Sequence, residues 1–310
     1  MNYRFIPNDG ARVAALQAGD VQIIDAVPTS DIARIRKEPH IAISEATSLR
    51  SIYLRTDFRS DAPSPYVFGP NGEKLDRNPL LDHRVREALS IAINRQGIAD
   101  RIMSGAAVPT GQFMPPGTYG YAPDIKPPPY DPARAKALLA EAGFPNGLTI
   151  QLNASNDRYV NDAQIAQTIG QMWSRVGVKT QVDTVPFAVN AQRSARRDFS
   201  VTLGGWSNST GEPSSGLRGL LGTRDVSRGW GTVNQAGYSS AEYDRLVEQG
   251  LVTVDDEKRE QLWQQAVRVA VRDVAWIPLH TQVNVWAMRD NLKHTPRADE
   301  MTRAMDVAPR

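Results

Sequence analysis

The sequence predicts a mixed α/β fold built as two lobes. The chain has 310 residues, of which 41% are hydrophobic and 23% are charged, so it can bury a substantial core and exceeds the usual size of one domain. Apolar and polar residues alternate over 148–153 and again over 178–182, and a helical pattern fills 157–176 between them. Two such strands joined by a helix are expected to run parallel with a right-handed crossover.

The composition excludes several classes of protein. The formal net charge is +2 and the arginines are scattered, so no strong field favours a nucleic acid as partner. The chain has no cysteine, which excludes disulfides, zinc–thiolate sites and cysteine nucleophiles but leaves the compartment open. No apolar run in the sequence approaches the ~20 residues that cross a bilayer.

Short elements are predicted before residue 80. A strand tail is followed by a helix from Asn8 or Asp9, a stop at Gly19 and a strand over 21–24. A helix over 28–36 comes next, and then separate strands over 41–44 and 51–54. The segment 57–79 is rich in Asp, Ser, Pro and Gly, so we expect a loop there.

Three helices are predicted over 82–143. The first begins at Asp82, whose side chain can accept from free backbone N–H groups, and we expect Arg86 and Arg95 to face water. The second spans 96–103, and the prolines between 109 and 129 then predict an extended loop because each lacks a backbone donor. The third helix begins at Asp131, with Pro132 at its first position.

The rest of the chain alternates strands and helices. We expect a helix over 186–197 and a strand over 199–203, which leads through Gly204, Gly205 and Trp206 into a polar loop over 207–215. Helices are predicted over 239–249 and 255–272, and separate strands over 275–279 and 283–288. A polar tail follows from residue 293.

No catalytic or metal-binding motif stands out. The four histidines form no i, i+4 pair and have no acidic partner at ligand spacing, and there is no Gly-x-Ser-x-Gly turn. We therefore expect no metal, no cofactor, no catalytic residue and no enzymatic activity.

The polar loop after the strand at 199–203 is the leading candidate for a ligand site, because ligands of α/β sheets bind beyond the carboxyl ends of strands. An aromatic wall beside hydroxyls, an amide and a carboxylate suits a zwitterionic peptide. The candidate ligand-binding residues are Trp206, Ser207, Asn208, Ser209, Thr210 and Glu212. The alternative is that Trp206 packs in the core and the loop is an ordinary turn.

Three segments carry a resemblance to a known family. They are DHRVREALSIAINR at 82–95, the Pro-Pro-Gly at 115–117 and YDPARAKALLAEAGF at 130–144. In this order they resemble the substrate-binding proteins of peptide-type ABC importers, the solute-binding protein family 5. The resemblance implies a periplasmic-binding-protein-like fold of the peptide-binding cluster, with the first lobe incomplete. It divides the chain into 1–53 and 277–310 for the first lobe and 54–276 for the second.

The resemblance also implies roles for individual residues. Trp206 matches the family tryptophan that faces the ligand, but Ser209 stands where oligopeptide binders have an aspartate. The string WSNSTGE is similar instead to the glutathione-binding branch, in which Glu212 would meet an ammonium group, or else cap the following helix. Further candidates that border the cleft are Arg228, Trp230, Asn234, His280, Gln282 and Asp57.

The function implied by the resemblance is capture of a short peptide or peptide-like solute, such as glutathione or a di- or oligopeptide, by hinge closure. The partner would be an inner-membrane ABC permease, and the protein a periplasmic monomer. No secretory signal is visible at the start of the chain, so we expect a fragment or a product begun at an internal methionine. Alternatives are an opine or nickel-chelate binder of the same fold, a hydrolase, or a partner-binding module.

Overall fold

The structure is a computed structural model, and it describes residues 2–310. No helix within these residues is long and apolar enough to cross a membrane. The helices are α1 (Asp9–Ala18), α2 (Thr29–Ile35), η1 (Pro79–Leu81), α3 (His83–Ile91), α4 (Arg95–Gly97), η2 (Ile98–Ile102), α5 (Pro132–Glu141), α6 (Asp162–Ser174), α7 (Phe187–Ala195), α8 (Ser214–Gly216), η3 (Leu217–Leu221), α9 (Ala241–Val252), α10 (Asp256–Arg272) and η4 (Ala304–Asp306). The strands are β1 (Ile23–Ile24), β2 (Ile41–Thr56), β3 (Val67–Phe68), β4 (Ala107–Pro109), β5 (Leu148–Ser155), β6 (Val178–Val185), β7 (Val201–Ser207), β8 (Ile277–Arg289), β9 (Leu292–His294) and β10 (Val307–Pro309).

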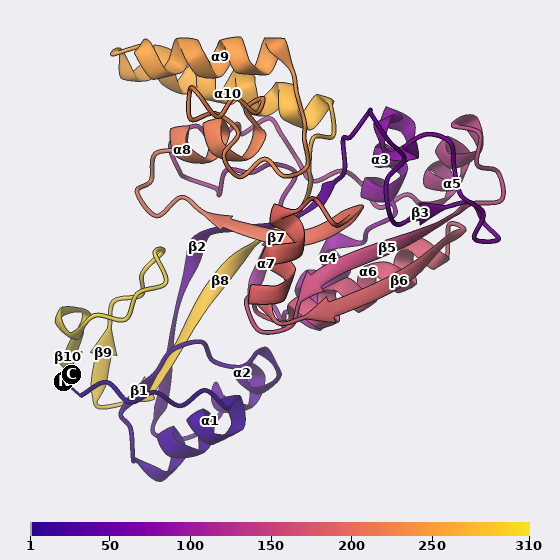
Figure 1. Ribbon diagram of the computed structural model, residues 1–310. Coiled ribbons are helices and arrows are strands. Elements are labelled where there is room, and N and C mark those ends of the chain that lie inside the picture. The colour runs from indigo at the N-terminus through magenta and orange to yellow at the C-terminus, as the bar shows by residue number, and fades with distance from the viewer. Residues whose placement is uncertain (1) are drawn as a thin grey trace.

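Two long antiparallel strands, β2 and β8, connect the two lobes. Figure 1 shows them leaving the larger lobe, which carries α3 to α10, and running together into the smaller lobe with α1, α2 and β1. The main sheet has the order β1-β8-β2-β7-β5-β3, with β4 added beside β8 and β6 beside β5. Strand β5 pairs in parallel with β6, as the strand-helix-strand pattern predicts, and also in parallel with β7.

The ladder between β2 and β8 is interrupted where the chain passes from one lobe to the other. Thr47 pairs with Val283 and Ser51 pairs with Thr281, so the register shifts across 48–50. A second shift lies between Ile52 and Tyr53. Such irregularities bend and twist a strand pair locally, which marks this point as the crossing between lobes.

Three apolar clusters form the core. The largest lies between the sheet and α3, α5 and α6 and includes Leu89, Ile150 and Trp173. A second joins β2 and the proline-rich loop over 109–129 to α9 and α10, with Tyr53 stacked on Trp276 at 4.2 Å. The third belongs to the smaller lobe and packs α1 and α2 against β1 and β8. Each lobe therefore buries apolar surface of its own.

Several predicted helix starts are confirmed. Asp82 caps α3 by accepting from Arg84 N at 2.9 Å, and Asp131 caps α5 with Pro132 at its first position. Asn8 caps α1 by accepting from Ala11 N. Each cap supplies an acceptor for a backbone donor that has no partner inside its helix.

The prediction that Arg86 and Arg95 face water is wrong. Both are buried, and each guanidinium donates to backbone carbonyls, Arg86 to those of Leu80 and Asp273 and Arg95 to that of Pro278. The amphipathic pattern of a helix identifies polar residues but cannot show that a neighbouring loop offers carbonyls to them.

Some boundaries also differ from the predictions. The strands predicted separately over 41–44 and 51–54 form one long strand, β2, and those predicted over 275–279 and 283–288 form another, β8. The register shift between β2 and β8 bends both strands without ending them. Pro109 lies in the short strand β4, at its last position, where a missing N–H costs least. The helix expected from residue 157 begins at Asp162, after Asn161 in a left-handed conformation with φ of 56°.

Candidate ligand-binding site

The end of β7 lies beside the crossing between lobes. Trp206 pairs with Ser51 on β2, and Ser51 pairs in turn with Thr281 on β8, so the three residues form one row across the sheet. Side chains of adjacent strand residues project from opposite faces, and the two faces of this ladder carry different groups.

Trp206 occupies the first face. Its indole Nε1 donates to Asn208 Oδ1 at 3.1 Å, which fixes the ring orientation. A Cβ added to Gly216 would come within 2.9 Å of that nitrogen and within 2.8 Å of the Phe113 ring, so the glycine allows the indole to lie close to α8. Trp206 is half-buried against the second cluster, so part of its surface is uncovered.

The loop after β7 divides into buried and exposed parts. Asn208 is buried, accepts from Trp206 and donates from its backbone to the Leu49 carbonyl at 3.2 Å. Ser209 and Thr210 are exposed. Glu212 accepts from the backbone N of Ser214, the first residue of α8, at 2.9 Å. The Glu212 carboxylate is thus engaged by the first residue of α8.

The second face of the ladder holds Arg50 and Tyr159. Arg50 pairs with Ser207 across the two strands, and its guanidinium lies 5.8 Å from the centroid of the Tyr159 ring. The Tyr159 hydroxyl donates to the Gly205 carbonyl at 3.2 Å. A Cβ on Gly205 would meet the Tyr159 ring at 2.8 Å, so only glycine lets the ring lie on the strand.

Arg50 is paired with a residue of the C-terminal tail. Its Nε and Nη2 donate to the two carboxylate oxygens of Glu300, each over 2.7 Å, and Ser48 Oγ donates to the same carboxylate at 2.9 Å. Nearby, Leu49 N donates to the Ala298 carbonyl. The tail therefore lies along the irregular segment of β2, as Figure 1 shows for the yellow segment that follows β9.

His280 and Gln282 lie on β8 at the same crossing and are buried. His280 pairs with Ile52 of β2 and Gln282 with Ala107 of β4. Neither ring nitrogen of His280 has a hydrogen-bond partner, and Gln282 Oε1 also lacks one. Burial lowers the pKa of His280 to about 4, so the ring is neutral near pH 7. Both residues adjoin the Trp206 row, but neither side chain is open to a solute.

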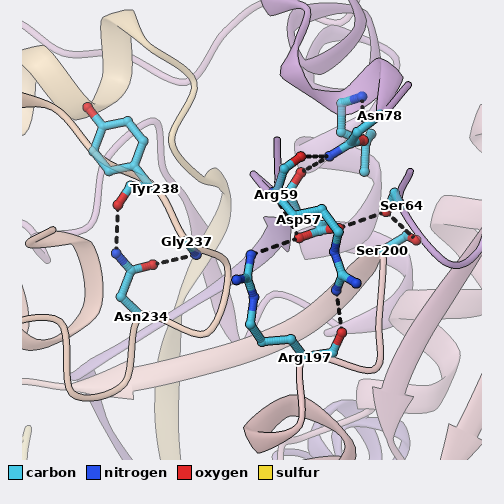
Figure 2. A network of polar contacts seen from close by, with 10 residues as sticks. Asp57, Arg59, Ser64, Asn78, Arg197, Ser200, Asn234, Gly237 and Tyr238 are labelled. Atoms are coloured by element: carbon cyan, nitrogen blue, oxygen red, sulfur yellow. Dashed lines mark hydrogen bonds and ion pairs between the residues drawn. The ribbon is translucent and has the colours of Figure 1, made fainter. Parts of the chain in front are cut away.

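Asp57 lies away from this crossing. It follows the end of β2, six residues beyond Ser51, or about 20 Å along a strand. Figure 2 shows its carboxylate between Arg59 and Arg197, with Ser64 Oγ donating at 2.9 Å. Burial raises the pKa of the Asp57 carboxyl, against the effect of Arg59. Every polar atom of this side chain is committed to the fold, so we do not include it in the proposed site.

The loop that carries Arg228, Trp230 and Asn234 makes its hydrogen bonds, ion pair and stacking contact with groups other than Trp206. Asn234 closes its own loop by donating to the carbonyls of Gly222 and Tyr238 and accepting from Gly237 N, part of which Figure 2 shows. Trp230 is buried in the second cluster, and exposed Arg228 stacks on it at 5.1 Å while pairing with Glu248. This loop serves the packing of α9.

Arg50, Tyr159 and Glu300 were not predicted from the sequence. A single arginine inside a strand pattern gives no sign that a carboxylate 250 residues later will reach it. The only local signal was the alternation around Trp206, which places Arg50 beside Ser207 once the pairing of β2 with β7 is known. Within residues 2–310, no group of three or more His, Asp or Glu side chains could hold a metal ion.

Two lobes joined by a strand pair, with an aromatic residue and a polar loop at the crossing, are the arrangement expected of a two-lobed α/β binding protein. The chain belongs to the bacterial extracellular solute-binding proteins, family 5, whose middle-region model matches residues 1–228. This confirms the family resemblance of the sequence and its predicted fold class.

Relatives and solved structures agree with this assignment. Heme-binding protein A of Haemophilus influenzae is 29% identical over 93% of this chain and 49% of its own length. The glutathione-binding protein GsiB of Escherichia coli is 29% identical over 94% of this chain and 54% of its own length. The chain thus spans about half the length of the curated relatives it matches.

Two solved structures show the same fold. The periplasmic binding protein DppA from Helicobacter pylori, in complex with the peptide STSA, superposes with a TM-score of 0.81 at 22% identity, over 99% of this chain and 56% of that one. The binding protein AgaA from A. tumefaciens, in complex with agropinic acid, gives a TM-score of 0.75 at 23% identity, over 93% of this chain and 55% of that one.

Proposed function

We propose that this chain is part of the extracytoplasmic binding component of an ABC importer and that it captures a short peptide or peptide-like solute. The observation that carries the proposal is the position of Trp206, a half-buried indole held by Asn208 at the crossing of β2, β7 and β8. In a family of solute-binding proteins, a fixed aromatic surface beside a hinge is suited to contact a ligand that both lobes enclose.

The proposed site consists of groups that are open at this position. They are the indole of Trp206, Ser207 at the end of β7, and the exposed hydroxyls of Ser209 and Thr210. A small apolar cavity of about 20 Å³ lies on the same side, lined by Phe113, Leu217 and Trp276 among others. It has room for about one water molecule, so a solute would meet Trp206 at the surface.

Hinge closure is the proposed mechanism. A ligand that contacts both lobes stabilises the arrangement in which they approach each other, and no bond is broken. The division into 1–53, 54–276 and 277–310 is proposed with it, and the separate apolar cluster of α1 and α2 supports that division. We propose a periplasmic monomer that delivers its solute to a membrane permease and has no enzymatic activity.

The ligand class is argued from the relatives. Glutathione is in the name of GsiB and heme in that of heme-binding protein A, while DppA was solved with a peptide. The WSNSTGE string is similar to the glutathione-binding branch, and Ser209 stands where oligopeptide binders have an aspartate, so glutathione comes before other short peptides as a candidate. The AgaA complex makes an opine such as agropinic acid the second candidate.

Calorimetric titration of the 310-residue chain tests this proposal. The probes are glutathione, di- and tripeptides, heme and agropinic acid, and each sample is examined afterwards by mass spectrometry for cleavage products. Saturable heat with one probe and no products supports solute capture, and micromolar affinity corresponds to about −8 kcal/mol. Product formation would favour a hydrolase, and a lack of heat with every probe would contradict the proposal.

A further inference from the structure

Arg50 holds Glu300 in the geometry by which a guanidinium recognises a carboxylate. Two parallel N–H···O bonds of 2.7 Å join the two groups, and Ser48 adds a third donor at 2.9 Å. Paired bonds of this kind are specific for planar anions and do not depend on the molecule that carries the carboxylate. The side chain of Arg50 is 13% exposed and that of Glu300 is 29% exposed, so solvent reaches the pair.

Glu300 lies in a segment without regular secondary structure. It belongs to the tail between β9 and η4, which has no regular structure, and its backbone has φ of 67°. That left-handed conformation disfavours residues with a Cβ, so the pairing with Arg50 is maintained against a local preference. Burial alone would raise the pKa of the Glu300 carboxyl, but Arg50 and Ser48 outweigh it and the pKa lies below its usual range.

A second guanidinium lies beside the pair without a counterion. Arg158 is exposed, forms no ion pair within residues 2–310, and lies 5.4 Å from the centroid of the same Tyr159 ring that Arg50 approaches at 5.8 Å. Its charge also favours the ionised form of Glu300. Two guanidinium groups therefore act on the Glu300 carboxylate, whereas the nearby Asp162 carboxylate accepts from the backbone N atoms of Arg158 and Tyr159.

We propose that Arg50 and Arg158 form a carboxylate-binding site on the face of the β2–β7 ladder opposite Trp206, in which Glu300 is an internal occupant that a solute carboxylate replaces. The ligand class is a small organic anion with at least one carboxylate, and a second anionic group would meet Arg158. Displacement of Glu300 would break the side-chain contact between the tail and the irregular segment of β2 and leave the backbone bond from Leu49 N to the Ala298 carbonyl. The site is separate from the Trp206 surface, so it stands whether or not Trp206 contacts a solute.

The alternative is that the pair only anchors the tail. In that case Arg50 would not respond to free carboxylates even after Glu300 is neutralised. The two possibilities differ in a spectroscopic signal of Arg50 itself, so the test requires neither a peptide ligand nor transport.

The experiment follows the Arg50 Nε–Hε resonance by NMR during titration with succinate, with sodium chloride at matched ionic strength as reference. The resonance is assigned by its loss in Arg50→Lys. In Glu300→Gln we expect half-saturation at a succinate concentration about five-fold lower than in the wild type, because the internal competitor is gone. Adding Arg158→Gln to that variant should raise the half-saturating concentration again by about three-fold.

Glu248→Gln is the matched control, because it neutralises an ion pair with Arg228 in the loop that packs on α9. It should titrate like the wild type. The proposal is overturned if Arg50 in Glu300→Gln shifts no more with succinate than with chloride, or if Glu248→Gln gives the same gain.

A thermal measurement keeps the test decisive if Glu300→Gln does not fold. About 50 mM succinate should raise the Tm of the wild type above its value in matched chloride, because a ligand of the folded state stabilises it. Arg50→Gln should lack this rise. An equal rise in both proteins would overturn the site.

Discussion

Asn161 Nδ2 donates to Thr29 Oγ1 over 2.7 Å, and this bond joins the start of α6 in the larger lobe to the start of α2 in the smaller one. The same amide donates to the Ile102 carbonyl, also over 2.7 Å. Asn161 has φ of 56°, a conformation that asparagine tolerates better than other residues with a Cβ. One side chain thus sets both a backbone turn and a contact between lobes.

Asn161→Ala should lower the free energy of unfolding by about 2–4 kcal/mol, because it removes both bonds and forces a left-handed alanine. Asn161→Gly removes the same bonds but accepts the backbone conformation, so its loss should be smaller by about 1 kcal/mol. Urea denaturation of the two variants separates the backbone contribution from the side-chain contribution. A glycine variant as unstable as the alanine variant would disprove the role of the turn.

The buried guanidinium of Arg95 should be essential for stability. It donates to the Pro278 carbonyl at 2.6 Å and to Ser90 O and Oγ at 3.0 and 2.9 Å. Arg95→Met leaves these buried acceptors without a donor, and we expect a loss of about 3 kcal/mol. Exposed Arg101, six residues along, is the control, and its change to Met should alter stability by less than about 0.5 kcal/mol. Equal effects of the two changes would contradict this account.

His280 should make the folded state sensitive to acid. Its pKa is lowered to about 4 by burial, from 6.5 for an ordinary histidine, so the unfolded chain takes up this proton first as the pH falls. Stability is therefore lost between pH 6.5 and about 4, by about 3 kcal/mol from this residue alone. His280→Leu should lose less stability over that range than the wild type.

Urea midpoints between pH 4 and 7 measure this difference. The control is His83→Gln, because the side chain of His83 is 49% exposed on α3. If the acid dependence of His280→Leu matches that of the wild type, the buried neutral histidine is not the cause.

Asn234 should affect stability and not solute binding. Its three hydrogen bonds close the loop from Gly222 to Tyr238, so Asn234→Ala is expected to cost about 2–4 kcal/mol. The neighbouring change Arg228→Ala removes only an exposed ion pair, and we expect less than about 1 kcal/mol. A weaker affinity for a bound solute in folded Asn234→Ala would return this loop to the proposed site.

The sequence predicted the fold well where the signal is local. Caps such as Asp82 and Asp131 are visible because the capping residue lies next to the helix that it starts. The burial of Arg95 and the pairing of Arg50 with Glu300 could not be predicted, because both depend on groups far away in the chain. The same is true of Asp57, whose carboxylate suggested a ligand contact until Arg197 was found beside it.

The candidate site was predicted only in part. The strand that ends in a polar loop identified Trp206, since the rule about strand ends requires no knowledge of pairing. The polarity of Asn208 and Glu212 suggested ligand contacts as well, yet Asn208 accepts from the Trp206 indole and Glu212 accepts from the backbone N of Ser214. Short polar side chains serve turns and ligands equally, so composition cannot assign them.

The central claim is that a solute contacts Trp206 at the crossing between lobes, and calorimetric titration of Trp206→Ala tests it most directly. With the best probe of the wild-type screen, we expect at least about a ten-fold loss of affinity, because an aromatic contact of about 1.4 kcal/mol or more is removed. Tyr130→Ala, which truncates an exposed aromatic residue before α5, should bind like the wild type. Unchanged affinity in folded Trp206→Ala would contradict the assignment of the site.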